Sequence, residues 1–245
     1  MPCSRVILSV INEICNIQPI AKQMQTIPVE TTAVYAVIPA LNEVKTIQQV
    51  VSSVKAFTPN VVVVDDGSTD NTAQLAAEAG AHTVVHPANR GYDKSIEDGF
   101  RYVEQQKNAR VIFTFDADGQ HSSEVLQELI QPILDNKADI VVGIRPFKAR
   151  IAEKMLAIYT RHRFGITDPL CGLKAYDVKV YRDIGFFDRI SSIGTELVLR
   201  SALKGYRIKQ IPIPIRNRQD KSRFGESLKG NCKIFRAFLR ILLYV

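Results

Sequence analysis

Short runs of β-branched residues alternate with longer helical patterns between residues 33 and 201, and this alternation constrains the fold more than any other feature. It is typical of a parallel sheet whose strands are joined by crossover helices. We predict strands over residues 33–38, 61–64, 81–86, 111–115 and 139–143. We predict helices over residues 44–56, 72–79, 95–106, 122–134, 151–163 and 196–203, and an extended piece over 207–215. The sequence therefore predicts an α/β fold with a mostly parallel central sheet flanked by helices.

Length and composition fit one large domain with extensions. Of the 245 residues, 46% are hydrophobic and 23% are charged, which are ordinary values for a globular protein. The net charge of +7 at pH 7 favours anionic partners, which include nucleotide phosphates, nucleic acid and an acidic membrane surface. Four scattered cysteines without a CxxC spacing indicate neither a zinc site nor a disulfide framework, so we expect reduced thiols and a cytoplasmic protein. They are Cys3, Cys15, Cys171 and Cys232.

Both ends of the chain carry amphipathic patterns. Residues 1–30 are predicted as an N-terminal amphipathic extension, with apolar residues on one helical face before Pro19. Residues 219–245 are predicted as a basic amphipathic segment that lies in a membrane interface, or that packs on the core or against a second subunit. No apolar stretch reaches the roughly 18–20 residues that a membrane-crossing helix needs. The basic stripe of the C-terminal segment consists of Lys229, Lys233, Arg236 and Arg240.

Polar segments follow the first two predicted strands. In open parallel sheets, ligands bind beyond the carboxyl ends of the strands. Residues 39–43, with the sequence PALNE, follow the first strand, and residues 65–71, with the sequence DDGSTDN, follow the second. We interpret a carboxylate of the second segment as a group that holds a base or ribose. The alternative is that this segment serves only as a turn and a helix cap.

Two carboxylates separated by one residue follow the fourth predicted strand. Asp116 and Asp118 would repel each other, and a hard divalent cation that prefers oxygen ligands gives this arrangement a purpose. Mg²⁺ keeps several waters and is often shared between one or two carboxylates and substrate phosphates. The alternative is again a turn or cap. His121 is interpreted as a neighbour of this pair, with a ligand role left open.

Seven segments in this order resemble the family 2 glycosyltransferases of the GT-A fold, most closely the branch similar to dolichyl-phosphate mannose synthase. The resemblance spans residues 33–229 and implies a single GT-A catalytic domain over residues 31–218. Because the segments occur together and in order, chance similarity is not a competing explanation. The segments are VIPALNE, VVVVDDGSTDNT, NRGYDKSIEDGF, FTFDADGQH, VVGIR, DPLCGLKAY and ELVLRSALKGYRIKQIPI.

The resemblance also implies roles for individual residues. Those expected at the nucleotide are Pro39, Ala40, Asn42, Glu43, Asp66 and Gly67. Asp116, Asp118 and Gln120 are expected to surround Mg²⁺ or Mn²⁺ and the donor diphosphate. Arg145 follows the fifth strand and is expected to meet phosphate, since a guanidinium can grip two oxygens at once; the alternative is a solvated surface arginine. Asp118, Arg145 and Asp168 are the candidate catalytic residues.

Two later segments depart from the branch pattern. Residues 168–174, with the sequence DPLCGLK, stand where the branch has Asp-x-x-Ser-Gly-Phe-Arg on the acceptor side. Cys171, which replaces the serine, has no evident histidine partner and is not expected to be a nucleophile. Residues 216–229 resemble a segment that closes over the donor phosphates, with extra residues after Arg218 and with the final Leu228 and Lys229 exchanged. Arg218 and Lys229 are the candidate cations there.

These interpretations predict an inverting glycosyltransferase. The donor is expected to be a nucleotide sugar, GDP-mannose or a UDP-hexose, and the acceptor a polyprenyl or dolichyl phosphate at the cytoplasmic face of a membrane. A phosphate acceptor is already ionised near neutral pH, whereas a hydroxyl acceptor needs a general base, for which Asp168 or Glu196 are the candidates. The alternatives are transfer to a saccharide hydroxyl and a catalytically silent nucleotide-sugar binding protein. No nucleic-acid motif is recognisable, so no nucleic-acid partner is predicted.

Overall fold

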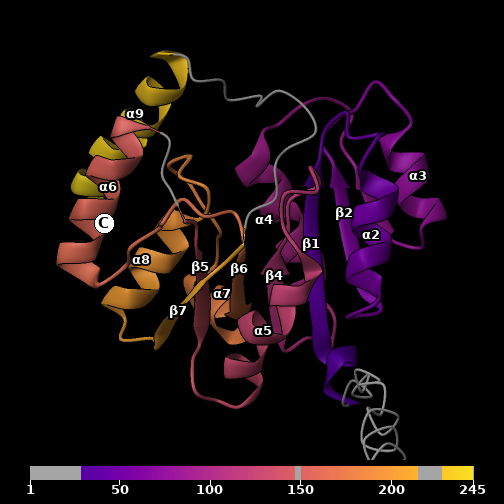
Figure 1. Ribbon diagram of the computed structural model, residues 1–245, viewed down its shortest axis with the longest axis horizontal. Coiled ribbons are helices and arrows are strands. Elements are labelled where there is room, and N and C mark those ends of the chain that lie inside the picture. The colour runs from indigo at the N-terminus through magenta and orange to yellow at the C-terminus, as the bar shows by residue number, and fades with distance from the viewer. Residues whose placement is uncertain (1–28, 147–149, 215–227, 245) are drawn as a thin grey trace, which may run out of the picture.

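The chain folds around one seven-stranded sheet (Figure 1). The computed structural model describes residues 29–146, 150–214 and 228–244. The strand order is β3-β2-β1-β4-β6-β5-β7, and every neighbouring pair is parallel except that β6 runs antiparallel to both β4 and β5. The predicted α/β fold with a mostly parallel sheet is confirmed. The strands are β1 (Val34–Ala40), β2 (Asn60–Asp65), β3 (His82–Val85), β4 (Val111–Thr114), β5 (Ile140–Ile144), β6 (Lys174–Asp177) and β7 (Ile208–Pro212).

Side chains alternate between the two faces of the sheet and build a separate apolar core on each. In β1, Val34, Ala36 and Ile38 belong to one core, whereas Tyr35 and Val37 belong to the other. This period of two is what a strand buried on both faces produces. The first core is covered by α2 (Ile47–Lys55), α3 (Thr72–Glu78) and α5 (Leu126–Leu134). The second is covered by α4 (Tyr92–Glu104), α6 (Ile151–Phe164), α7 (Val178–Ile184) and α8 (Thr195–Leu203).

Several boundaries differ from the predictions. Helix α4 begins at Tyr92, three residues earlier than predicted, because Gly91 with a φ of 94° turns the chain into the helix. Helix α2 begins at Ile47 rather than at residue 44. The helix predicted over 122–134 is divided into a 3-10 turn, η2 (Ser123–Val125), and α5. A second 3-10 turn, η1 (Val29–Ala33), precedes β1. Strand β6 and helix α7 were not predicted at all.

Antiparallel β6 brings a distant segment to the functional edge of the sheet. The carboxyl ends of β1, β2, β4 and β5 lie at one edge, because these strands run in the same direction. Strand β6 runs the other way, so its first residue, Lys174, lies at that same edge, opposite Thr114. The residues that precede it, 168–173, are therefore placed beside the loops that follow β4 and β5.

Helix α9 (Leu228–Tyr244) lies alongside α6 (Figure 1). Ala237 and Ile241 are buried, and the rings of Tyr159 and Phe238 lie 5.6 Å apart. Arg240 donates from Nη1 to the carbonyl oxygen of Ile190 at 3.3 Å. One face of the C-terminal helix therefore packs on the domain, which was one of the alternatives left by the sequence. The predicted N-terminal extension, apart from η1 at its end, lies outside the described residues.

Within the described part of the chain, no helix has the length and apolar character needed to cross a membrane.

Candidate active site

The segments that follow β1 and β2 are joined by hydrogen bonds. The backbone N–H of Asn42 donates to Oγ of Ser68 at 2.8 Å, and Oδ1 of Asn42 accepts from the N–H of Thr69 at 2.8 Å. The N–H of Glu43 donates to Oγ1 of Thr72, also at 2.8 Å. Asn42 holds this position with a φ of 49°, a left-handed conformation that asparagine tolerates better than most residues. The two segments therefore form one connected rim.

Asp66 organises the loop that leads into α4. Its Oδ1 accepts from the N–H of Arg90 and lies 2.8 Å from Nδ1 of His86, and its Oδ2 accepts from the N–H of Gly91. Gly67 adopts a φ of 77°, and an added Cβ would lie 2.7 Å from the backbone carbon of Ala88. Asp66 thus holds the neighbouring loop by hydrogen bonds, and Gly67 leaves room for the close approach of that loop. The predicted contact of Asp66 with a base or ribose stays a prediction.

A cavity of about 300 Å³ opens at the carboxyl edge of the sheet, where these loops meet α6 and α9. Its walls carry charges of both signs. Acidic side chains come from the loops after β1 and β4, from the start of α4 and from α6, and basic side chains come from the loop after β5, from the start of α6 and from α9. The charged lining residues are Glu43, Asp93, Asp116, Asp118, Arg145, Arg150, Glu153 and Lys233.

Asp116 is held on three sides. Its Oδ1 accepts from the hydroxyl of Tyr92 at 3.1 Å, and its Oδ2 lies 3.1 Å from Nε2 of His121. Burial raises the pKa of Asp116, but the hydrogen bonds from His121 and Tyr92 and the charge of Lys174 outweigh it and lower the pKa overall. A Cβ added at Gly172 would lie 2.5 Å from Oδ2, so only a glycine leaves room for this carboxylate. Asp116 is therefore an ionised carboxylate held in a fixed position.

The acidic pair has the donor chemistry of a magnesium or manganese site. Asp118 lines the same cavity, and its Oδ1 accepts from the N–H of Gln120 at 3.1 Å. Gly119, which lies between Asp118 and Gln120, has a φ of 73° and turns the chain at this point. No cluster of three or more His, Cys, Asp or Glu side chains suited to a metal exists among residues 29–146, 150–214 and 228–244. Two carboxylates that leave the remaining positions to water and phosphate fit Mg²⁺ or Mn²⁺ better than a closed site would.

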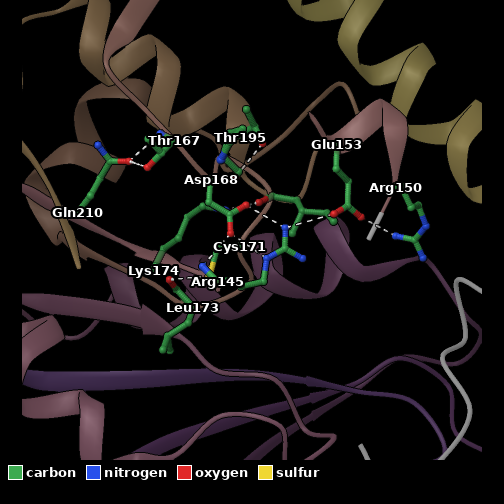
Figure 2. Close-up of polar contacts among 12 residues, drawn as sticks. Arg145, Arg150, Glu153, Thr167, Asp168, Cys171, Leu173, Lys174, Thr195 and Gln210 are labelled. Atoms are coloured by element: carbon green, nitrogen blue, oxygen red, sulfur yellow. Dashed lines mark hydrogen bonds and ion pairs between the residues drawn. The ribbon is translucent and has the colours of Figure 1, made fainter. Parts of the chain in front are cut away.

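The basic wall is built on Arg145 and Arg150, each paired with a buried carboxylate (Figure 2). Arg145 donates from Nε to Oδ2 of Asp168 and from Nη2 to Oδ1, both at 2.8 Å. Asp168 is 1% exposed. Burial lowers the pKa of Arg145, but the charge and hydrogen bonds of Asp168 raise it overall, so the guanidinium stays charged. Arg150 donates to Oε1 of Glu153 at 2.7 Å, and Oε2 of Glu153 lies 3.7 Å from Nη2 of Arg145.

Cys171 lies beneath this wall and is fully buried. Burial, and then the charge of Asp168, raise the pKa of its thiol to about 12. The thiol is therefore protonated at neutral pH, which agrees with the expectation that it is not a nucleophile.

The structure brings some of the predicted site residues together and leaves others apart. Those that line the cavity are Pro39, Glu43, Asp116, Asp118, Gln120 and Arg145. The predicted residues that do not line the cavity are Ala40, Asn42, Asp66, Gly67 and Asp168. Arg218 lies outside the described residues, and the side chain of Lys229, at the start of α9, is likewise not described. Residues that the sequence did not single out for the site also line the cavity, among them Tyr92, Asp93, Arg150, Glu153 and Lys233.

The sheet and the acidic and basic walls at its carboxyl edge define a GT-A type of transferase domain. Residues 35–182 match the family model described as Glycosyl transferase family 2, and the chain belongs to this family. The resemblance inferred from the sequence is thereby confirmed.

Relatives of the chain include proteins named for lipid-linked acceptors. An uncharacterized glycosyltransferase of Mycobacterium tuberculosis is 30% identical over 221 residues, which cover 86% of this chain and 98% of that protein. A dolichyl-phosphate hexose transferase of Haloferax volcanii is 27% identical, over 82% of this chain and 90% of its own. A UDP-N-acetylglucosamine–dolichyl-phosphate N-acetylglucosaminyltransferase of Methanococcus voltae is 29% identical over 173 residues, which cover 58% of this chain and 68% of that protein.

Solved structures share the fold. Glucosyl-3-phosphoglycerate synthase of Mycobacterium tuberculosis, in complex with Mg²⁺ and UDP, superimposes with a TM-score of 0.68 at 19% identity, over 85% of this chain and 79% of that one. The same enzyme has been crystallised with Mn²⁺, UDP and phosphoglyceric acid. At this identity the similarity establishes the GT-A fold of the chain.

Proposed function

We propose that this glycosyltransferase moves a hexose from a UDP- or GDP-sugar to a polyprenyl phosphate at a membrane surface, with inversion at the anomeric carbon and with Mg²⁺ or Mn²⁺ as cofactor. Relatives named for dolichyl-phosphate transfer support the acceptor class. The neighbours crystallised with UDP and Mg²⁺ or Mn²⁺ support the donor and cofactor classes.

The donor end of the cavity is the acidic wall. Asp116 and Asp118 would hold the cation together with the donor diphosphate, and Gln120 stands beside them. When bound, the cation supplies positive charge for the departing diphosphate. Tyr92 and His121 fix the Asp116 carboxylate in advance, which is the kind of outer support that metal-binding carboxylates need.

The choice of acceptor rests on Asp168 and Glu196, the two candidate general bases for a hydroxyl acceptor, because the side chains of both are already engaged. Both oxygens of Asp168 are occupied by Arg145. Glu196 is 1% exposed and accepts from the N–H of Arg189 and from Nε of Arg200, each at 2.8 Å. Neither lines the cavity. A phosphate acceptor needs no base, and Arg145 with Arg150 offers two cations to receive it.

In the proposed reaction, a phosphate oxygen of the acceptor attacks the anomeric carbon from the face opposite the diphosphate. The bond from the anomeric carbon to the diphosphate oxygen breaks, and its electron pair stays with the departing nucleoside diphosphate. No proton needs to be removed from the acceptor, because its phosphate is already ionised.

The α6–α9 surface supports a position at a membrane. Large apolar side chains stay exposed along both helices, with Ile151 and Ile158 at 73% and 70%. Exposed basic side chains stand among them, including Lys154 on α6 and Arg236 on α9. An apolar surface with basic neighbours is attracted to anionic lipid. Among the side chains that the structure describes, the exposed large apolar residues on this surface are Ile151, Met155, Ile158, Phe235, Leu239, Leu242 and Leu243.

The proposal is tested by offering radiolabelled UDP- and GDP-hexoses with two phosphate acceptors in parallel, a polyprenyl phosphate in detergent and 3-phosphoglycerate in buffer. We expect metal-dependent label in the organic phase with the lipid, and no such label for Asp118→Ala. A product formed only with 3-phosphoglycerate, or only on an added oligosaccharide, would overturn the lipid acceptor. Nucleotide-sugar binding without transfer or donor hydrolysis would favour a catalytically silent binding protein.

A further inference from the structure

The carboxyl of Asp93 lines the cavity but belongs neither to the proposed metal site at Asp116 and Asp118 nor to the basic wall. It lies in the first turn of α4, next to Tyr92, and lines the cavity. Its Oδ1 is buried and has no hydrogen-bond partner among the described residues. A buried acceptor without a donor costs about 1–3 kcal/mol. The fold therefore keeps an unused hydrogen-bond acceptor at the cavity that is proposed to hold the substrates.

A carboxyl in this position is unsuited to the phosphates. The cavity is proposed to hold two anionic groups, one at the Asp116 and Asp118 corner and one at Arg145 and Arg150. A third carboxylate repels both, so its favourable partner is a neutral donor. The transferred sugar must lie between the two anionic groups, and its hydroxyls are neutral donors. The chemistry of Asp93 therefore matches a sugar hydroxyl.

The loop that lines the cavity beside Asp93 is strained. Ser191 and Ile193, which also line the cavity, have φ angles of 61° and 57°. A β-branched residue rarely adopts this left-handed conformation, and such strain concentrates at functional sites.

The half-buried Asp188 and the buried Lys174 hold this strained loop. Asp188 accepts from the N–H groups of Ile190, Ser192 and Gly194. Lys174, itself 1% exposed, donates from Nζ to the carbonyl of Ile193 at 2.7 Å.

We infer that Asp93 hydrogen-bonds a hydroxyl of the transferred sugar, with the loop of Ser191 and Ile193 closing the same subsite, and that it thereby contributes to the choice of hexose. The inference rests on the proposed function for the existence of a nucleotide-sugar donor. It goes beyond that function by naming the residue that recognises the sugar rather than the nucleotide. Burial and the nearby Asp188 raise the pKa of Asp93 to about 7, although the charges of Lys233 and Lys174 and a backbone hydrogen bond from Ile193 lower it.

The test compares sugar nucleotides with the nucleotide alone. Binding of UDP-glucose, UDP-galactose, UDP-N-acetylglucosamine and GDP-mannose, and of UDP and GDP, is measured by calorimetry with Mn²⁺ for the wild type, Asp93→Ala and Asp93→Asn. We expect Asp93→Ala to weaken the preferred nucleotide sugar about 10- to 100-fold, as for a lost hydrogen bond to a charged group, and to leave the nucleoside diphosphate unchanged. Asp93→Asn should retain part of the affinity and reduce the discrimination between hexoses. Asp135→Ala, at an exposed position on the far end of α5, is the matched control.

Each other outcome overturns the inference. Equal weakening of the nucleotide sugar and of the nucleotide would mean that Asp93 supports the donor pocket as a whole. Unchanged sugar binding with lost transfer would make it a general base instead. If the wild type binds UDP or GDP but binds no nucleotide sugar more tightly than the matching nucleoside diphosphate, the sugar subsite alone is refuted. If the wild type binds no nucleotide at all, the proposed function is refuted as well. Circular dichroism shows whether a variant has unfolded, and Asp93→Asn provides the comparison if Asp93→Ala does not fold.

Discussion

Asp168 receives the guanidinium of Arg145 through two parallel hydrogen bonds of 2.8 Å, and its Oδ2 also accepts the backbone N–H of Arg145 at 3.0 Å. The two residues are 23 positions apart, with Arg145 directly after β5 and Asp168 in the segment before β6, and their side chains face each other (Figure 2). Asp168 thus acts on the cavity through Arg145: it fixes the side chain that faces the proposed acceptor phosphate.

Asp168→Asn should uncouple this pair. The change leaves Arg145 charged but without its bidentate acceptor, and breaking a buried pair costs about 3 kcal/mol or more. We expect a lower midpoint in urea unfolding and a raised KM for the phosphate acceptor. Asp183→Asn, which breaks the surface pair with Lys204, should change neither quantity noticeably. Equal stability of Asp168→Asn and the wild type would contradict the role assigned to this pair.

Gly172→Ala should weaken metal binding at the proposed site of Asp116 and Asp118 without unfolding the domain. The new Cβ would lie 2.5 Å from Oδ2 of Asp116 and would push the carboxylate aside. Changes to the groups around a metal-binding carboxylate typically cost 10- to 100-fold in metal affinity, so, if Asp116 holds the proposed cation, we expect about tenfold weaker Mn²⁺-dependent binding of UDP. The measurement is a double-mutant cycle with Asp116→Ala. In that background Gly172→Ala should have no further effect on binding; additive losses would show that it acts elsewhere.

Cys171→Ala should keep transfer activity. The thiol is buried and its pKa is about 12, so it carries no thiolate at neutral pH. We expect turnover within about twofold of the wild type, together with a loss of stability of about 1 kcal/mol from the small cavity. Turnover is measured with saturating donor and acceptor. A loss of several hundredfold in a folded variant would show that the cysteine takes part in the chemistry.

The sequence predicted the parts of the fold that depend on local pattern. Strands β1, β2 and β4 consist of apolar runs that are buried on both faces, and each was placed to within two residues. Strand β6 was missed because its four residues, KAYD, begin with a lysine. Lys174 is buried in a strand, and the carbonyl of Ile193, 19 residues away, accepts its Nζ hydrogen bond. That tertiary contact leaves no local signal in the sequence.

The same division holds for the candidate site. Asp116, Asp118 and Arg145 follow strands directly, and the topology of a parallel sheet brings such residues to one edge. Arg150, Glu153 and the other helix residues reach the cavity only through the packing angles of their helices. Asp93 lay within a recognised segment, but the segment gave no reason to choose it, because its burial depends on the loop at Ile193.

The pH dependence of stability provides a test of the buried state of Asp93. Its pKa is about 7 in the folded protein and near the ordinary value of 3.8 in the unfolded chain. The folded state therefore binds this proton more tightly, so the stabilisation is complete below about pH 4 and is lost as the pH rises through 7. Asp93→Asn has no such proton. We therefore expect the free energy of unfolding of Asp93→Asn, relative to that of the wild type, to rise by roughly 2 to 4 kcal/mol from pH 4 to pH 8.

This difference is measured by urea unfolding across the pH range. The charged groups that act on Asp93 are Asp188, which raises its pKa, and Lys174 and Lys233, which lower it. Asp135→Asn is the control, because the hydrogen bonds of Lys137 and Gln131 lower the pKa of Asp135 and place its titration below this range. Its unfolding curve should run parallel to that of the wild type from pH 5 to pH 8. A parallel course for Asp93→Asn as well would mean that Asp93 is solvated and already ionised, and the unused acceptor beside the substrates would not exist.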